Sequence, residues 1–411
     1  MIWILLGCIK HGDFGVDEPT NLSGVVDPQS IHPSCLDDSG LIVETPNEST
    51  FAAYHRKGFT RYTQVVAPNG GIIPIFAQDK ISDEQLIRAR NILRFFLTNA
   101  PGTTLGTDKS AVANSMVNNR AVLMMPNGEH REGREPNLDA QPLYEAETQV
   151  EGHNWFMNNN YEHRDAAFEE IFHLVHDAGI GTYMQGALPD YQTDLLSEAN
   201  SAIEDGRWGI AVEESVDDWL EDLRREDSLA QEYIVSVLES YYGFWSAWDG
   251  DGGMWGIYIA GDRDEVHQLD PRGQLLIEDF LPPMIHTEFR LHPELNQDFY
   301  MSLNPDLVYT HRSQYYSFLT LTGTNDVGLF GNEENNTLRG NIGNNVLDGV
   351  GGENTVIYCH SIEEYEVSIE QESQSRTVIS IHGPEGEDTL LNIDWIHFAD
   401  GKMNVDSIID H

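Results

Sequence analysis

The most constraining feature of this sequence is a nine-residue repeat that begins at residue 331. Three consecutive units read GNEENNTLR, GNIGNNVLD and GVGGENTVI. Each unit has glycine first, asparagine sixth and an aliphatic residue eighth, at Gly331, Gly340 and Gly349, at Asn336, Asn345 and Asn354, and at Leu338, Leu347 and Val356. Glycine lets the chain turn, and the aliphatic side chain of each turn can point into a narrow core. This period predicts stacked turns that form a parallel β-roll.

The repeat resembles the hemolysin-type (RTX) calcium-binding repeat, whose pattern is G-G-x-G-x-D-x-U-x with U a large aliphatic residue. The segment GEDTLLNIDWIHFADG, residues 386–401, is similar to the one that closes such C-terminal domains in secreted bacterial proteins. Together the two matches cover about residues 321–411. The resemblance implies an all-β tail, bound calcium, an extracellular destination, and type I secretion directed by an uncleaved C-terminal signal.

One departure from that family concerns its calcium ligands. The sixth-position aspartate of the family is asparagine in all three units, at Asn336, Asn345 and Asn354. An asparagine offers a carbonyl oxygen without charge, and calcium affinity falls as the ligands lose charge. With Asp348 as a further ligand, we expect weak calcium binding. The alternative is a roll held by asparagine ladders and an aliphatic core, with little or no calcium.

Residues 51–320 carry a different pattern, in which strands and helices follow one another irregularly. Ser82 and Gln85 form the capping box of a helix. The predicted strands cover residues 70–77 and 121–126, and the predicted helices cover residues 82–99, 108–118, 164–178, 214–225, 228–245 and 270–280. This order predicts an α+β domain. Residues 1–50, rich in Gly, Pro, Asp, Asn and Ser, predict an irregular arm.

The stretch FEEIFHLVHDAGIG, residues 168–181, holds the candidate site. On a helix, Glu169, His173 and His176 lie at positions i, i+4 and i+7 and share one stripe, with Glu170 beside it. Two ligands one turn apart on one helix face, next to a carboxylate that can accept a proton, form the arrangement that a zinc-binding helix needs. We therefore interpret this stripe as a candidate zinc site.

The stretch is similar to the H-E-x-x-H motif of the zincin metallopeptidases. Carried over onto this sequence, the resemblance makes His173 a zinc ligand and Glu170 the general base. Glu169 stands where the motif has its first histidine, and His176 could replace that missing imidazole. In zincins of the glutamate type a further ligand comes from a following helix, where QEYIVSVLESYYGFW offers Glu232 and Glu239; we favour Glu232.

Two observations argue against a working peptidase. The chain lacks the H-x-x-G-x-x-H extension of the metzincins, which the serralysins combine with a hemolysin-type tail. A solvent-exposed helix face would also explain Glu169, Glu170 and Asp177 without any metal. The motif alone is therefore a hypothesis.

Charge and cysteine content limit the partners and the compartment. The chain has 23 basic and 68 acidic residues, a formal net charge of −45, which argues against binding to nucleic acid or to an anionic membrane surface. No apolar run is long enough to span a membrane. Three cysteines make no disulfide framework, although a Cys8–Cys35 bridge could form. The Leu-Leu-Gly-Cys ending at Cys8 resembles a lipoprotein cleavage box, which leaves lipid anchoring as the alternative to secretion.

The sequence thus predicts a secreted, acidic bacterial protein of two domains: a zincin-like domain at 51–320 and a β-roll tail at 321–411. Its expected function is zinc-dependent hydrolysis of a protein or peptide. The alternative is a non-enzymatic extracellular protein, such as an adhesin, a matrix component or a calcium-binding protein, on a degenerate zincin scaffold.

Overall fold

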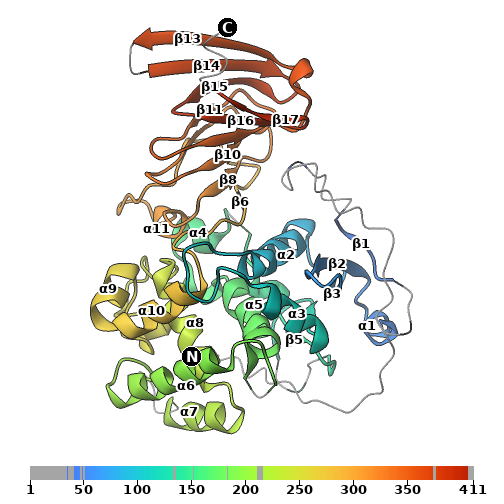
Figure 1. The fold of residues 1–411 in the computed structure, drawn as a ribbon, viewed down its shortest axis with the longest axis vertical. Coiled ribbons are helices and arrows are strands. Elements are labelled where there is room, and N and C mark those ends of the chain that lie inside the picture. The colour runs from blue at the N-terminus through green and yellow to red at the C-terminus, as the bar shows by residue number, and fades with distance from the viewer. Residues whose placement is uncertain are drawn as a thin grey trace. The chain divides into compact units, whose positions relative to one another are not determined.

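The chain folds into two compact units (Figure 1). The computed structural model describes residues 35, 41–46, 49, 51–131, 133, 136–150, 152–182, 184–210, 216–373 and 376–405. Among these, unit 1 takes residues 41–149 and 160–283, and unit 2 takes residues 35, 150–159 and 284–405. Most of the arm expected over residues 1–50 lies outside the described residues. The structure confirms that the chain contains both helices and strands. The strands form several sheets, in which parallel pairs occur.

Unit 1 combines a five-stranded sheet with most of the helices. The sheet has the order β1-β2-β3-β4-β5, in which β1, β2 and β3 pair antiparallel and β3, β4 and β5 pair parallel. Its strands are β1 Val43–Glu44, β2 Arg61–Val66, β3 Ile72–Ala77, β4 Leu123–Met125 and β5 Gln141–Pro142. Its helices are α1 Ala52–Arg56, α2 Asp83–Leu97, α3 Ser110–Asn118, α5 Ala167–Val175, α6 Pro189–Glu204, α7 Val216–Arg225, α8 Leu229–Tyr241, α9 Arg263–Leu269 and α10 Pro271–Phe280. Short 3₁₀ turns cover Glu145–Glu147, Tyr161–His163 and Met254–Gly256.

The helix that carries the motif, α5, is fixed by aromatic packing against α2. Ser82 caps α2, and the capping box with Gln85 that the sequence predicts is present. The ring of Phe96 on α2 lies 5.8 Å from that of Phe168 and 5.1 Å from that of Phe172, edge to face. Phe168 and Phe172 are both fully buried. Burial of such a ring is worth about 1.5–3 kcal/mol, so this apolar face determines which way α5 turns its polar stripe.

The end of this helix at residue 178, predicted from the sequence with Gly179 as the stop, is wrong. After Val175 the chain continues as a π-helix, His176–Gly181, and Gly181 has a positive φ of 107°. A Cβ atom at Gly179 would lie 2.7 Å from a methyl group of Val112 on α3. Gly179 therefore permits close approach of α3, and the conformation that favours glycine is needed two residues later.

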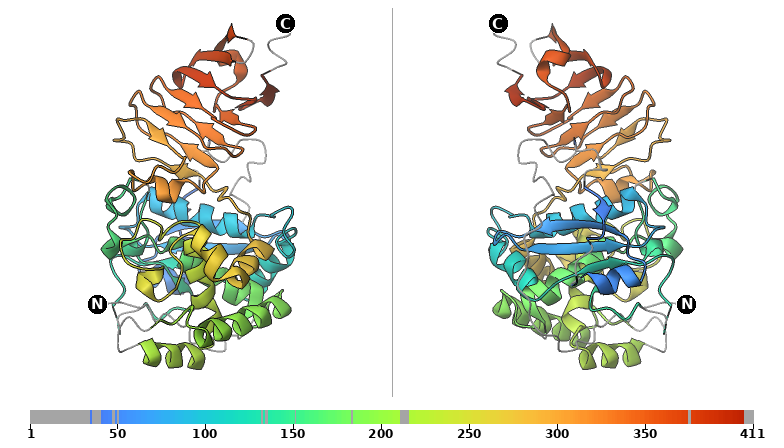
Figure 2. Two further views of the ribbon diagram at one scale, coloured as in Figure 1. Left: turned by 90° about the vertical axis from the view of Figure 1, so that its left-hand side faces the viewer. Right: turned by 90° about the vertical axis from the view of Figure 1, so that its right-hand side faces the viewer.

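Unit 2 begins as a coil of short strands, β6 to β12, that alternate between two sheets (Figure 2). The sheets have the orders β17-β16-β12-β10-β8-β6 and β13-β14-β15-β11-β9-β7, and after β12 the strands β13, β14 and β15, and β16 and β17, pair antiparallel. Thr337 pairs in parallel with Thr355, and Gly328 with Val346, so paired positions differ by 355 − 337 = 18 and 346 − 328 = 18 residues. One coil is thus two nine-residue units, each of which supplies one strand.

The strands of unit 2 begin before the repeat does. They are β6 Phe289–Arg290, β7 Phe299–Tyr300, β8 Phe318–Thr320, β9 Gly328–Phe330, β10 Thr337–Arg339, β11 Val346–Asp348, β12 Thr355–Ile357, β13 Glu366–Ser373, β14 Arg376–Gly383, β15 Gly386–Leu391, β16 Trp395–Phe398 and β17 Gly401–Asn404. Two short helices, α4 Asn154–Asn158 and α11 Thr310–Ser313, and a 3₁₀ turn at Ile362–Glu364 complete the unit. The coil therefore starts N-terminal to residue 321, with β6 and β7.

The first, sixth and eighth positions of the nine-residue repeat each have a physical role in the coil. The eighth-position side chains Leu338, Leu347 and Val356 are fully buried. The sixth-position asparagines are buried as well, with at most 2% of each residue exposed. A Cβ atom at Gly331 would lie 2.0 Å from Oδ1 of Asn336. The leading glycine is therefore required because the asparagine side chain occupies the space where a side chain would be.

A disulfide in unit 2 corrects the cysteine prediction. Cys35 is bonded to Cys359, which lies 324 residues away in the sequence. This pairing rules out the Cys8–Cys35 bridge, and Cys8 itself lies outside the described residues. Sequence spacing could not reveal the pair, because the two cysteines meet only through the tertiary fold.

Candidate metal centre

The polar stripe of α5 and the π-helix after it is buried. Glu169, Glu170, His173, His176 and Asp177 are each between 0 and 9% exposed. The interpretation of these residues as a solvated helix face is therefore wrong. Burying charged groups costs free energy unless they are paired or bind an ion, so this stripe must have compensating partners.

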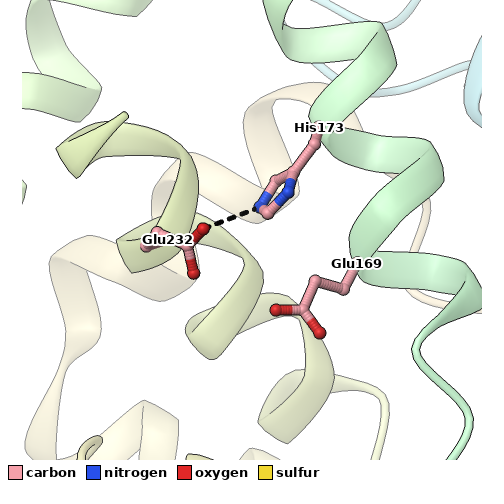
Figure 3. Close-up of side chains that lie close together, drawn as sticks. All are labelled: Glu169, His173 and Glu232. Atoms are coloured by element: carbon pink, nitrogen blue, oxygen red, sulfur yellow. Dashed lines mark ion pairs between the residues drawn. The ribbon is translucent and has the colours of Figure 1, made fainter. Parts of the chain in front are cut away.

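The neighbouring helix α8 brings a third carboxylate to this stripe. Glu169, His173 and Glu232 each offer one ligand atom, and these atoms all lie within 4.8 Å of one another (Figure 3). Nε2 of His173 lies 3.7 Å from Oε1 of Glu232. Two ligands that hold one zinc ion at about 2.1 Å and at a tetrahedral angle are about 3.4 Å apart. The separation is thus too long for a hydrogen bond and close to what a shared metal ion requires.

The imidazole of His173 supports this interpretation. Its Nε2 atom is buried and has no hydrogen-bond partner in the part of the chain that the structure describes. A buried polar atom without a partner is uncommon in a native protein. A metal ion bound to Nε2 would satisfy it, and Glu169 and Glu232 would supply oxygen ligands. A donor set of one imidazole and two carboxylates suits zinc, iron or manganese, so the group could hold a metal ion without determining which.

Glu170 lies at the other nitrogen of the same ring. Its Oε2 is 3.7 Å from Nδ1 of His173 and accepts a hydrogen bond of 2.7 Å from Nε2 of Gln141, on β5. This distance to Nδ1 is longer than a hydrogen bond; a carboxylate that accepts one from the second nitrogen of a ligating histidine fixes the orientation and the tautomer of the ring, and a small approach would give Glu170 that role. The structure thus places Glu170 beside His173, on the side of the ring away from Glu232.

Arg164 supplies the main positive charge at the group. Its guanidinium forms an ion pair with Oε2 of Glu169, and its other terminal nitrogen lies 2.7 Å from Oε1 of Glu239 on α8. Nε1 of Trp245 donates a hydrogen bond of 2.6 Å to the second oxygen of Glu239. Arg164 and Glu239 are both buried, so this pair is screened little by solvent.

Carboxylates outnumber cations here, and their pKa values reflect it. Burial raises the pKa of Glu232, Glu239 and Glu147 well above the usual range of a carboxyl group, and neighbouring carboxylates add to the effect. Burial by itself would lower the pKa of His173, but Glu232 and Glu170 outweigh it and raise this pKa to about 10. The group therefore holds extra protons when no metal is present, and a divalent cation could take their place.

His176 is not brought into the group. Its Nε2 lies 2.5 Å from Oε1 of Gln192, on α6, and burial lowers its pKa to about 4. The backbone of His176 is still α-helical, with φ of −66° and ψ of −51°, and the π-helix continues from it. His176 is therefore a neutral, buried imidazole with a different partner from His173.

The residues expected to bind calcium form a ladder in unit 2. Oδ1 of Asn336 accepts a hydrogen bond of 2.7 Å from the backbone N of Asn332, and Oδ1 of Asn354 accepts one of 2.9 Å from the backbone N of Asn336. Both amide oxygens thus accept from backbone donors, that of Asn336 within its own turn and that of Asn354 from the neighbouring coil. In the part of unit 2 that the structure describes, no group of three His, Cys, Asp or Glu side chains could hold an ion.

The same ladder continues through Asn345 and Asp348. Oδ1 of Asn345 accepts a hydrogen bond of 2.9 Å from the backbone N of Asn341, while Oδ1 of Asp348 accepts from the backbone N of Val350 at 2.9 Å. All four expected calcium ligands therefore have hydrogen-bond donors within the protein.

A cavity of about 430 Å³ lies apart from the metal group. It opens where β3 and β4 end and is lined by Lys57, Gln78, Pro126, Asn127, Gly128, Glu129, Arg131, Pro136 and Tyr144. None of the three residues of the metal group lines it. We take the buried group as the candidate metal site, because its three side chains converge on one point. Among the described residues, those that line the cavity form no such group.

Comparisons with known proteins add no relative: no family model, curated protein or solved structure matches the chain. Among the described residues, no helix is both long and apolar enough to cross a membrane.

Three residues at the site were not predicted from the sequence: Arg164, Gln141 and Glu147. Arg164 lies only five residues before Glu169, but no motif requires an arginine there, and Gln141 and Glu147 come from a different part of unit 1.

Proposed function

We propose that this protein is a secreted, metal-dependent hydrolase of the peptidase type, with a zincin-like catalytic domain and a β-roll tail. The observation that carries the proposal is the buried group of Glu169, His173 and Glu232 with an unsatisfied Nε2 on His173. A helix that buries two ligands one turn apart, opposite a carboxylate from a second helix, is the arrangement on which zinc hydrolases rely.

In this proposal each residue has one role at the site. His173, Glu232 and Glu169 hold a zinc ion, which when bound would polarise a scissile carbonyl group. On the resemblance of the motif, Glu170 would take a proton from the attacking water; for this its carboxylate would have to turn from Nδ1 of His173, where it lies in this structure, toward the metal side of the ring. Protein or peptide is the proposed substrate class, on the resemblance of the motif alone.

Two features of the chain support an extracellular destination. A disulfide such as Cys35–Cys359 forms and persists in oxidising compartments and is rare in the cytosol. A net charge of −45 suits a saline or calcium-rich medium. We propose export by the type I route, directed by the C-terminal segment. In the tail, the asparagine ladder would take over the role of calcium, so calcium binding would be weak and would add little stability.

A second function is favoured by one observation. Arg164 with Glu169 and Glu239, and His173 with Glu170 and Glu232, form charge pairs that could exist without a metal. A non-enzymatic adhesin, matrix component or surface protein could retain this network for structural reasons.

Metal analysis of protein purified without chelator separates the two functions. We expect one zinc per chain in the wild type, its loss in His173→Ala, and its retention in His176→Ala. The second variant is a matched control, because His176 is also a buried histidine of the same helical segment but contacts Gln192. Wild-type protein without metal, even after incubation with zinc, iron or manganese, would support the non-enzymatic function.

A further inference from the structure

Glu169 poses a problem of charge for the proposed metal site. The motif that the helix resembles has a neutral histidine at this position, and a glutamate adds one negative charge to the ligand set. More charge donated to the ion weakens its ability to polarise a substrate. A functional site of this composition would therefore need a positive charge near Glu169.

Arg164 meets this requirement. Its guanidinium contacts Oε2 of Glu169 directly, and 8% of the Arg164 side chain is exposed. Another buried arginine of unit 1, Arg88, is paired with Asp165 at 2.6 Å, which is not one of the three residues of the metal group. In a buried environment, one charge a few ångströms from another shifts an equilibrium by more than tenfold.

The surroundings of Arg164 hold it in place. The guanidinium packs on two indole rings that themselves meet edge to face, and it lies 5.6 Å from the centroid of Trp245 and 4.9 Å from that of Trp255. Trp255 and the preceding Met254 both have left-handed backbone conformations, with φ of 53° and 48°. Such conformations are unfavourable in a non-glycine residue and persist where the surroundings require them. They place Trp255 over Arg164.

The geometry points to Arg164 as a positioning residue that makes Glu169 act as a neutral metal ligand, so that the Arg164–Glu169 pair replaces the histidine of the zincin motif. This inference rests on the proposed metal site. It assigns to Arg164 the control of the charge that one ligand, Glu169, presents to the ion. The charged groups that surround the pair are Glu239, Glu170, Glu232, Glu147 and His173. Glu239 also forms an ion pair with Arg164, through the terminal guanidinium nitrogen that does not contact Glu169.

The inference makes an unusual prediction for Glu169→His, which restores the histidine of the motif. This variant leaves Arg164 next to an imidazole and a metal ion, with one positive charge in excess. We therefore expect it to bind zinc at least about tenfold more weakly than the wild type. Arg164→Met removes the compensating charge and should bind zinc more tightly. The double variant Arg164→Met/Glu169→His has the wild-type charge and should return to within about tenfold of wild-type affinity.

The test is zinc affinity in the full-length chain, measured by competition with a chromophoric chelator, with the visible spectrum of bound cobalt as a report on ligand geometry. Arg164→Lys keeps the charge and should stay close to the wild type. Arg88→Met is the matched control, since it removes a buried arginine whose partner, Asp165, is outside the group, and should leave affinity unchanged.

Several results would overturn the inference. Tighter zinc binding by Glu169→His alone would show that Arg164 does not set the ligand charge, as would weaker binding by a folded Arg164→Met. If Arg164→Met does not fold, the comparison of Glu169→His with the double variant decides: equal affinities would contradict compensation. Failure of the wild type to bind any metal would instead reject the proposed function, and with it this inference.

Discussion

Asp388 offers a test of the asparagine ladder, because an aspartate stands at the end of it. Oδ1 of Asp388 accepts a hydrogen bond of 2.8 Å from the backbone N of Asn345, and the Tyr358 hydroxyl donates one of 2.8 Å to Oδ2. Asp388 is 1% exposed. The perturbation is Asp388→Asn, which extends the ladder with the residue type of the repeat. Its carbonyl oxygen can keep the bond from Asn345, and the Tyr358 oxygen can accept from its amide.

The expected effect depends on pH. Burial raises the pKa of Asp388 to about 7, although the bonds from Asn345 and Tyr358 act to lower it. The folded state therefore prefers the protonated acid, and the unfolded chain, with a pKa of about 3.8, does not. The stability that this proton contributes is complete below about pH 4 and is lost as the pH rises to about 7. A shift of about three pH units corresponds to about 4 kcal/mol. The asparagine side chain does not titrate, so the variant does not lose this stability as the pH rises.

The assay is urea unfolding of the full-length wild type and variant at pH 5 and pH 8, with the tail followed by pulse proteolysis and mass spectrometry of its peptides. Other carboxylates titrate equally in both proteins, so their effects cancel in the difference. The advantage of Asp388→Asn should grow by about 2 to 3 kcal/mol between pH 5 and pH 8. A difference that stays constant, or a variant less stable at pH 8, would refute the reasoning.

Four further predictions concern the metal site, the repeat and export. Glu170→Gln should abolish any hydrolysis and weaken metal binding by about 10- to 100-fold at most, because the ring of His173 loses its orienting carboxylate; activity and metal content measured on the same sample distinguish the two effects. Metal affinity should rise about tenfold per pH unit between pH 6 and pH 9, since His173, with a pKa of about 10, must release its proton to bind the ion; calorimetry in buffers of different ionisation enthalpy would show no proton release if this is wrong. Gly340→Ala should destabilise the tail by about 1–3 kcal/mol, as its methyl group would lie 2.7 Å from Oδ1 of Asn345, whereas Gly401→Ala, with nothing within 4 Å, should have little effect in the same melts. Deletion of residues 321–411 should stop export from the native host, and normal levels of truncated protein in the medium would exclude the type I route.

The sequence alone determined those features that depend on local periodicity. Gly331, Asn336 and Leu338 recur every nine residues, and this spacing is enough to predict short parallel strands, because each unit repeats the same turn and the same inward side chain. The capping box of Ser82 and Gln85 is equally local. The alignment of Glu169 and His173 on one face follows from the 3.6-residue turn, and Glu232 was favoured by its position on a following helix.

Only the tertiary structure decided what those residues contact. The sequence could not distinguish a solvated stripe from a buried one, because Glu169 and His173 become buried only when α2, α8 and β5 pack around α5. Nor could it separate His173 from His176, since the partner of His176, Gln192, comes from a different helix, α6, and contacts it only in the folded chain.

Long-range pairs were the least accessible to sequence. Cys35 meets Cys359, and Arg164 reaches Glu239, through the fold and not through spacing. Periodicity reports what one element prefers by itself, whereas the compensation of a buried charge depends on residues from elements that are distant in the chain. Arg164 lies near Glu169 in the sequence, but no local pattern marks it, and the residues that hold it in place, Glu239, Trp245 and Trp255, are distant in the chain.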